Sequence, residues 1–419
     1  MVDAFATWKE IQMFFIRNKI DYKLMHSIDN NLYKSYRVNI YCKTLAQSTE
    51  KKLRSYKGEI HRSLHKVNFI CATLTPKAIK RIIELPEVEH ISMDSYAFLC
   101  GSSVLSANGV RIKGKCSLTG KGIGVALIDS GTYPHPDIET PNNKVKNFID
   151  LIRGYKYPYD DNGHGTFMSG LICGSGYSSK GMYKGLAENS SLYVIKAFNS
   201  IGRAYISDLL YAITLIIDDY EKYNIRVACL PFEIMEYDPY NMKIFSQLFD
   251  ELISLGIIPV VPTGSLGNLE GTITGVAALD NCITVGGLDT TGFQTRPYPY
   301  SSSGPAGKSN KPNFAAACVD ICSLNSNPNY IPERNGIKLY PHKLEKLYTT
   351  YTGTSCAAAY ISSIVAMLIE NNSDLTFKDI CSLLKVASTR IDESPWLQGE
   401  GIIDLATLLS NKEKISDKK

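Results

Sequence analysis

A run of small residues, Tyr-Thr-Gly-Thr-Ser-Cys-Ala-Ala-Ala at 351–359, leads directly into an apolar helical pattern that continues to Leu368. The pattern predicts that Ser355 lies at a helix N-terminus, where unpaired backbone N–H groups and the helix dipole stabilise negative charge. A nucleophilic serine needs that environment, because its attack on a carbonyl group creates an oxyanion. The same stretch is also compatible with an ordinary N-cap that opens a buried helix. Motifs upstream of this stretch help to decide between a nucleophilic serine and an ordinary N-cap.

Length and composition indicate an ordinary globular protein with two or three domains. The chain has 419 residues, of which 44% are hydrophobic and 21% are charged. Its net charge of +4 is small for this length, so charge gives no reason to expect nucleic-acid or membrane binding. The 11 cysteines lack metal-type spacing and predict free thiols in a reducing compartment. Because no signal peptide or membrane-length apolar run is visible, we expect a cytoplasmic protein.

The first hundred residues alternate between strand and helix patterns. The expected order is strand, helix, strand, helix, strand, at 36–42, 45–56, 67–74, 76–85 and 88–98. This order predicts a small α+β domain of ferredoxin-like type. We expect this domain at 1–104, a second domain at 105–410 and a charged tail at 411–419. The pattern leaves open whether the first domain has any bearing on the function of the second.

Two further motifs precede the serine stretch. Residues 125–128 predict a buried parallel strand, and Asp129 ends it at the edge where open α/β sheets build their sites. His164 lies between two glycines at a predicted helix start. Each residue alone has a structural explanation, since an Asp often caps a turn and a lone His is often structural. Together, Asp129, His164 and Ser355 occur in the chain order of the subtilisin catalytic triad.

Three motifs resemble those of the subtilisin-like serine proteases, the subtilases. They are Leu-Ile-Asp-Ser-Gly at 127–131, Asn-Gly-His-Gly-Thr at 162–166 and Gly-Thr-Ser-Cys-Ala at 353–357. The resemblance extends from about Thr119 to Leu408 and implies an α/β fold with a subtilisin-like parallel sheet flanked by helices. The N-terminal region resembles the family's propeptide, which acts as folding chaperone and inhibitor. The lack of a signal is similar to the intracellular branch of that family.

The resemblance implies acyl transfer by a triad of Asp129, His164 and Ser355. Ser355 would attack the peptide carbonyl, and His164 would accept the serine proton and later pass it to the leaving amine. Asp129 would hold the tautomer of the imidazole and stabilise the imidazolium. The backbone N–H of Ser355 would supply one oxyanion donor.

The expected oxyanion-hole residue departs from the family pattern. In subtilases, a strand that ends in Gly-Asn supplies the oxyanion-hole asparagine. Here that position holds Ser265 if the alignment has no gap, or Asn268 if the loop is three residues longer, and the downstream residues favour Ser265. In a subtilisin, loss of one such donor lowers turnover about 10²–10³-fold.

The expected substrate-binding strand departs as well. The family's Ser-Leu-Gly-Gly is replaced by Leu230, Pro231, Phe232 and Glu233. Proline lacks a backbone donor for a paired peptide, and the next two residues add bulk and charge. Glu233 hints at a basic residue near the cleaved bond.

Two functions from different classes follow. The first is a serine endopeptidase that the departures make slow or narrow in specificity, acting on a peptide or protein and inhibited by its own N-terminal domain. The alternative is a catalytically weak or inactive subtilase that acts as a binding or regulatory protein. We expect no cofactor and no nucleic-acid or membrane partner. Calcium is common among subtilases, but no cluster of Asp and Glu in the sequence indicates a metal site.

Overall fold

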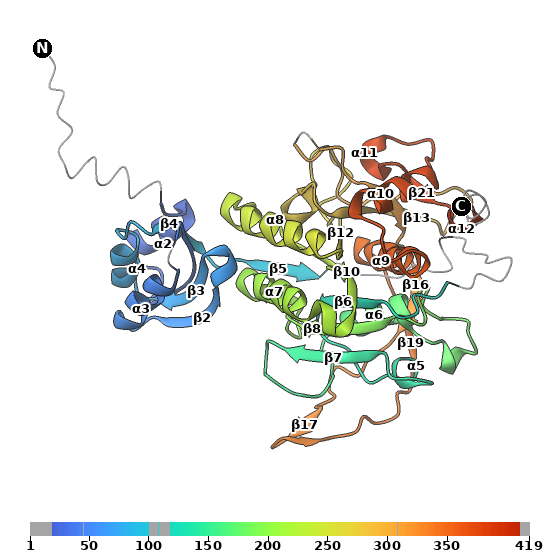
Figure 1. The fold of residues 1–419 in the computed structure, drawn as a ribbon, viewed down its shortest axis with the longest axis horizontal. Coiled ribbons are helices and arrows are strands. Elements are labelled where there is room, and N and C mark those ends of the chain that lie inside the picture. Colours follow the sequence, from blue (N-terminus) through green and yellow to red (C-terminus); the bar gives the residue numbers. More distant parts are fainter. Residues whose placement is uncertain (1–18, 45, 100–107, 109–117, 308, 411–419) are drawn as a thin grey trace, which may run out of the picture. The chain divides into compact units, whose positions relative to one another are not determined.

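The computed structural model describes residues 19–44, 46–99, 108, 118–307 and 309–410 (Figure 1). The chain divides into two compact units. Unit 1 contains the residues up to Tyr96 together with Tyr205–Thr214 and Pro239–Ile244, and unit 2 contains the rest. The predicted boundary between residues 104 and 105 and the predicted tail at 411–419 lie outside the described residues.

Unit 1 is built on an antiparallel four-stranded sheet with the order β2-β3-β1-β4. Its elements are α2 (Tyr22–Asp29), β1 (Tyr36–Cys42), α3 (Ala46–Ser55), β2 (Glu59–Leu64), β3 (Phe69–Leu74), α4 (Pro76–Ile82) and β4 (Val88–Met93). Apolar side chains of the helices and strands form one core, which includes Leu24, Ile40, Leu53, Ile79 and Ile91. The order confirms the predicted ferredoxin-like α+β domain.

The sequence interpretation missed β2 and the hairpin that it forms with β3. Only Leu64 of β2 is buried, because β2 is an edge strand with one neighbour. Such a strand carries little apolar alternation, so its sequence pattern does not distinguish it from a loop. The single strand predicted at 88–98 is also wrong, since β4 ends at Met93 and β5 (Tyr96–Leu99) follows separately.

Unit 1 also contains the first residues of α7 (Ile206–Tyr223), and an acidic side chain holds them. Asp94 accepts hydrogen bonds from the backbone N–H of Ser207 at 3.1 Å and from its hydroxyl at 2.6 Å. Arg37 donates to the same carboxylate at 2.7 Å. A carboxylate at a helix N-terminus is favourable because it satisfies free N–H groups and opposes the helix dipole.

Unit 2 is built on a ten-stranded sheet that is mostly parallel. In sheet order its strands are β20 (Ser388–Thr389), β21 (Ile402–Ile403), β15 (Phe314–Ala317), β13 (Ile283–Asp289), β12 (Ile258–Pro262), β10 (Ile225–Cys229), β6 (Gly124–Asp129), β8 (Ser191–Lys196) and β7 (Val145–Asp150), with β14 (Arg296–Pro297) paired to β13. All six residues of β6 are buried, as expected for a central strand covered on both faces.

Two buried helices pack on this sheet and on each other, α6 (His164–Cys173) and α9 (Thr354–Asn371) (Figure 1). Helix α9 contacts β6, β10, β12, β13 and β15. By length and composition it could cross a membrane, but 89% of it is buried inside the protein. We therefore interpret α9 as the core helix of unit 2, because a helix that is apolar all round belongs in an interior.

The remaining elements surround this core. Helix α7 and helix α8 (Pro239–Ser254) are each divided between the two units. The other helices are α5 (Pro136–Glu139), α10 (Phe377–Val386), α11 (Pro395–Gln398) and α12 (Leu405–Ser410). The other strands are the antiparallel pair β16 (Ile321–Leu324) and β19 (Tyr348–Tyr351), the hairpin of β17 (Glu333–Arg334) and β18 (Ile337–Lys338), and the short strands β9 (Arg203–Tyr205) and β11 (Phe232–Glu233).

Candidate active site

Asp129 and His164 meet as the sequence predicts. Asp129 is the last residue of β6, and His164 is the first residue of α6. The imidazole Nδ1 lies 2.9 Å from each carboxylate oxygen of Asp129, and both side chains are buried. Because an ionised carboxylate only accepts, Nδ1 carries the proton in this contact, and in the neutral imidazole Nε2 is then the nitrogen with a lone pair. The ring is therefore held in the tautomer that a general base requires.

Two glycines allow the close approach that brings this pair together. A Cβ at Gly165 would lie 2.0 Å from the carbonyl oxygen of Gly131. Gly131 itself has a φ of +114°, and a Cβ there would lie 2.1 Å from the carbonyl oxygen of Tyr159. The start of α6 therefore packs directly on the turn after β6, which is possible only without side chains at these two positions.

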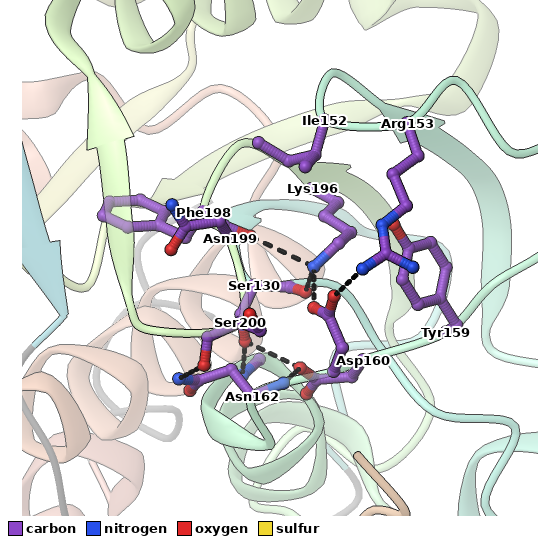
Figure 2. A network of polar contacts seen from close by, with 12 residues as sticks. Ser130, Ile152, Arg153, Tyr159, Asp160, Asn162, Lys196, Phe198, Asn199 and Ser200 are labelled. Atoms are coloured by element: carbon purple, nitrogen blue, oxygen red, sulfur yellow. Dashed lines mark hydrogen bonds and ion pairs between the residues drawn. The ribbon is translucent and has the colours of Figure 1, made fainter. Parts of the chain in front are cut away.

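A buried carboxylate caps the start of α6 (Figure 2). Asp160 accepts hydrogen bonds from the N–H groups of Gly163 and Thr166, each at 2.8 Å, and from the Thr166 hydroxyl at 2.7 Å. The hydroxyl of Ser130 donates to Asp160 at 2.9 Å and accepts from the N–H of Gly165 at 2.9 Å. These bonds tie the end of β6 to the first turn of α6, so they fix the backbone that carries the histidine.

A buried lysine completes this network, and sequence reasoning missed it (Figure 2). Lys196 ends β8, pairs in register with Asp129, and is 0% exposed. Its ammonium donates to the carbonyl oxygens of Ser130 at 2.5 Å and Phe198 at 3.1 Å, and to the carboxylate of Asp161 at 2.5 Å. The available signal was a single lysine at the end of an otherwise apolar strand, because a charge there must be paired.

We expect Lys196→Met to lower the free energy of unfolding by about 3–5 kcal/mol, because it leaves the Asp161 charge and two carbonyl groups without their buried donor. Urea unfolding would measure this loss. The double variant Lys196→Met with Asp161→Asn should recover part of it, since no unpaired charge remains. Lys184→Met is the matched control, because the Lys184–Glu188 pair lies at the surface. Its loss should lower the free energy of unfolding by less than about 1 kcal/mol. A loss equal to that control would contradict the prediction.

Ser355 lies in the first turn of α9 and is buried. Its hydroxyl donates to the carbonyl oxygen of Pro231 at 2.9 Å. The Tyr351 ring just before α9 is 6.2 Å from the His164 ring, centroid to centroid, and 5.0 Å from that of Phe167. Burial raises the pKa of Tyr351 to about 12, so this phenol stays neutral beside the histidine. Thus α6 and α9 bring the serine and the histidine into one region of unit 2.

The predicted oxyanion position holds Ser265 in the turn after β12. Gly264 has a φ of +101°, and its carbonyl oxygen accepts a hydrogen bond from the Thr354 hydroxyl at 3.2 Å, which joins this turn to the start of α9. Ser265 donates both its N–H and its hydroxyl to the carboxylate of Glu233. Asn268, the alternative residue, bonds through its N–H to the carbonyl oxygen of Pro299 at 3.1 Å.

Of residues 230–233, which the sequence predicts to bind substrate, Phe232 and Glu233 form strand β11. Its residues pair antiparallel with β5 of the same chain, Phe232 opposite Leu99 and Glu233 opposite Phe98. Strand β5 lies between β11 and β9 in a three-stranded sheet. Leu230 and Phe232 are fully buried, so their bulk packs into unit 2. Despite its proline, this stretch therefore pairs with an extended segment.

In the described part of the chain, no group of three or more His, Cys, Asp or Glu side chains is placed to hold a metal ion.

A family model described as the subtilase family matches residues 120–402, which include β6, α6 and α9. The chain belongs to the subtilase family. The match begins after unit 1's sheet and covers the region in which the three motifs were found.

Individual relatives agree with this assignment. This subtilase is 32% identical over 300 residues to serine protease AprX of Bacillus subtilis (strain 168), covering 69% of this chain and 66% of that protein. It is 25% identical over 312 residues to subtilisin-like protease 1 of Plasmodium berghei (strain Anka), covering 68% and 49%. The chain thus spans about two thirds and one half of the lengths of these relatives.

Solved structures show the same fold. Fervidolysin from Fervidobacterium pennivorans, a keratinolytic enzyme related to subtilisin, matches with a TM-score of 0.70 at 17% identity, covering 90% of this chain and 61% of that one. Sphericase matches with a TM-score of 0.59 at 22% identity, covering 72% and 98%. The predicted α/β fold with a subtilisin-like sheet is therefore confirmed.

Proposed function

We propose that this chain is a serine endopeptidase in which Asp129, His164 and Ser355 form the catalytic triad. The observation that carries the proposal is the bond from His164 Nδ1 to both oxygens of Asp129, at 2.9 Å each. Helix α6, which begins at His164, packs against α9, which carries the buried Ser355 in its first turn. Family membership supports the same reaction class.

Each residue then has a defined task. The Ser355 hydroxyl turns from the Pro231 carbonyl to Nε2 of His164, and its oxygen attacks the peptide carbonyl while its proton passes to Nε2, which gives a tetrahedral oxyanion and an imidazolium. Asp129 stabilises the imidazolium and remains ionised. The imidazolium then protonates the leaving amine, and water repeats the sequence on the acyl-enzyme. The positive end of the helix dipole at the first turn of α9 favours the oxyanion.

We further propose that the N-terminal region inhibits the protease by occupying its substrate strand. The pairing of β5 with β11 supports this, because β5 already takes the antiparallel position that an extended substrate would need. Ser355 bonds to Pro231, the residue directly before β11, so the paired segment runs toward the nucleophile.

One observation favours the second candidate function, a weak or inactive subtilase that works by binding. The Ser265 hydroxyl, which would donate to the oxyanion, donates instead to Glu233 at 2.5 Å. A hydroxyl has one proton, so it cannot serve both acceptors at once.

The two functions are separated by labelling the full chain with a fluorophosphonate and locating the adduct by peptide mass mapping. We expect one adduct, on Ser355, in the folded protein and none after unfolding in urea, because only the folded site activates the hydroxyl. If neither the full chain nor protein that has lost its N-terminal region acquires an adduct on Ser355, the protease proposal fails and the binding function takes its place.

A further inference from the structure

The contact between Glu233 and Ser265 joins two segments that both touch the nucleophile's helix. Glu233 belongs to β11, and Ser265 belongs to the turn after β12. The backbone N–H of Ser265 donates to Glu233 Oε2 at 2.7 Å, and the Ser265 hydroxyl donates to Oε1 at 2.5 Å. Both carboxylate oxygens are therefore engaged by one residue, which fixes the position of the acidic group.

The adjacent glycine makes room for this carboxylate. A Cβ built on Gly264 would lie 2.7 Å from Glu233 Oε2, closer than real side chains allow. The carbonyl of Gly264 accepts from Thr354, and Ser355 donates to Pro231, two residues before Glu233. The Glu233–Ser265 contact thus joins the two segments that are hydrogen-bonded to the first turn of α9.

This carboxylate has no cationic partner of its own. Among the residues that the structure describes, no Lys, Arg or His side chain forms an ion pair with Glu233. Glu233 is half-buried and lies on the strand that would pair with a substrate. An unneutralised negative charge there disfavours the developing oxyanion and favours a cation brought by the substrate.

On the basis of the proposed protease function, we propose that Glu233 selects substrates with a lysine or arginine side chain beside the scissile bond. The incoming cation pairs with the carboxylate and takes over the oxygens that hold Ser265. The Ser265 hydroxyl is then free to donate to the oxyanion. Substrate recognition and completion of the oxyanion site are coupled in this way, so the correct side chain raises kcat and not only binding.

The chain's own segment fits this inference. Residues 96–108, which include β5, contain no lysine or arginine. The segment that pairs with β11 therefore brings no cation to Glu233 and leaves Ser265 engaged. Such a segment is a poor substrate, which suits the inhibitory role proposed for it.

The test compares hydrolysis of two peptides that differ only in lysine or norleucine before the scissile bond, with rates normalised to fluorophosphonate-labelled enzyme. For wild type we expect kcat/KM to favour lysine by about tenfold or more. In Glu233→Gln the preference should fall below about threefold, with a faster norleucine reaction, because the charge is gone. Glu270→Gln is the matched control, since it removes an exposed charge from the loop that follows Ser265 and should keep the preference.

Ser265→Ala tests the coupling. It should lower kcat for the lysine peptide about tenfold or more without an equal change in KM, and should affect the norleucine peptide much less. Labelled enzyme without a lysine preference, or an unchanged preference in Glu233→Gln, overturns the Glu233 inference and leaves the protease function standing. An equal fall on both peptides in Ser265→Ala overturns the coupling. Absence of any labelling instead indicates failure of the protease function itself.

Discussion

Ser355→Ala is expected to abolish turnover, with a fall in kcat of about 10⁶-fold, the size of the loss when a subtilisin's serine is removed. In the proposed mechanism the acyl-enzyme bond forms on the Ser355 oxygen, and an alanine side chain has no oxygen. Wild-type protein should lose its N-terminal region slowly, by a cut between residues 96 and 106, because that segment brings no cation to Glu233 and is therefore a poor substrate. The variant should stay full length by intact mass measurement.

The matched control is Ser363→Ala. Ser363 lies on the same buried helix, and its hydroxyl donates to the carbonyl of Ala359 at 2.9 Å, so its loss tests for general damage to α9. This control should be processed and labelled as wild type is. Processing of Ser355→Ala at the wild-type rate, in purified protein, would contradict the assignment of Ser355 as nucleophile.

Asp129→Asn has the second largest expected effect, a fall in kcat of about 10⁴-fold, as known for other serine proteases with this triad. An asparagine would turn an N–H donor toward His164 Nδ1 and so force the ring into the tautomer that has no lone pair for Ser355. The fold should persist, because the remaining amide oxygen can still accept the Ser130 N–H that Asp129 accepts at 2.6 Å.

Peptide hydrolysis and urea unfolding on the same samples would separate the effect on chemistry from the effect on stability. The double variant Asp129→Asn with His164→Ala should be no slower than His164→Ala alone, since residues that act as a unit are not additive. A kcat within tenfold of wild type would show that the carboxylate is not needed to orient the imidazole.

Local patterns predicted the elements that carry the candidate triad. The apolar run before Asp129, the glycines around His164 and the small residues around Ser355 each specify a short piece of backbone. The structure has β6, α6 and α9 where those patterns indicated. These predictions succeeded because buried strands and helices have a strong apolar pattern, and β2 was missed because an edge strand does not.

The sequence by itself therefore determined the family, the order of the buried elements and the identity of the three candidate catalytic residues. Only the tertiary structure decided what surrounds them. Lys196 and Asp161 lie 35 positions apart, and Glu233 and Ser265 lie 32 apart, on elements that meet through sheet packing. A polar contact between distant segments leaves no local pattern, because it depends on where the backbone folds and not on the spacing of apolar residues.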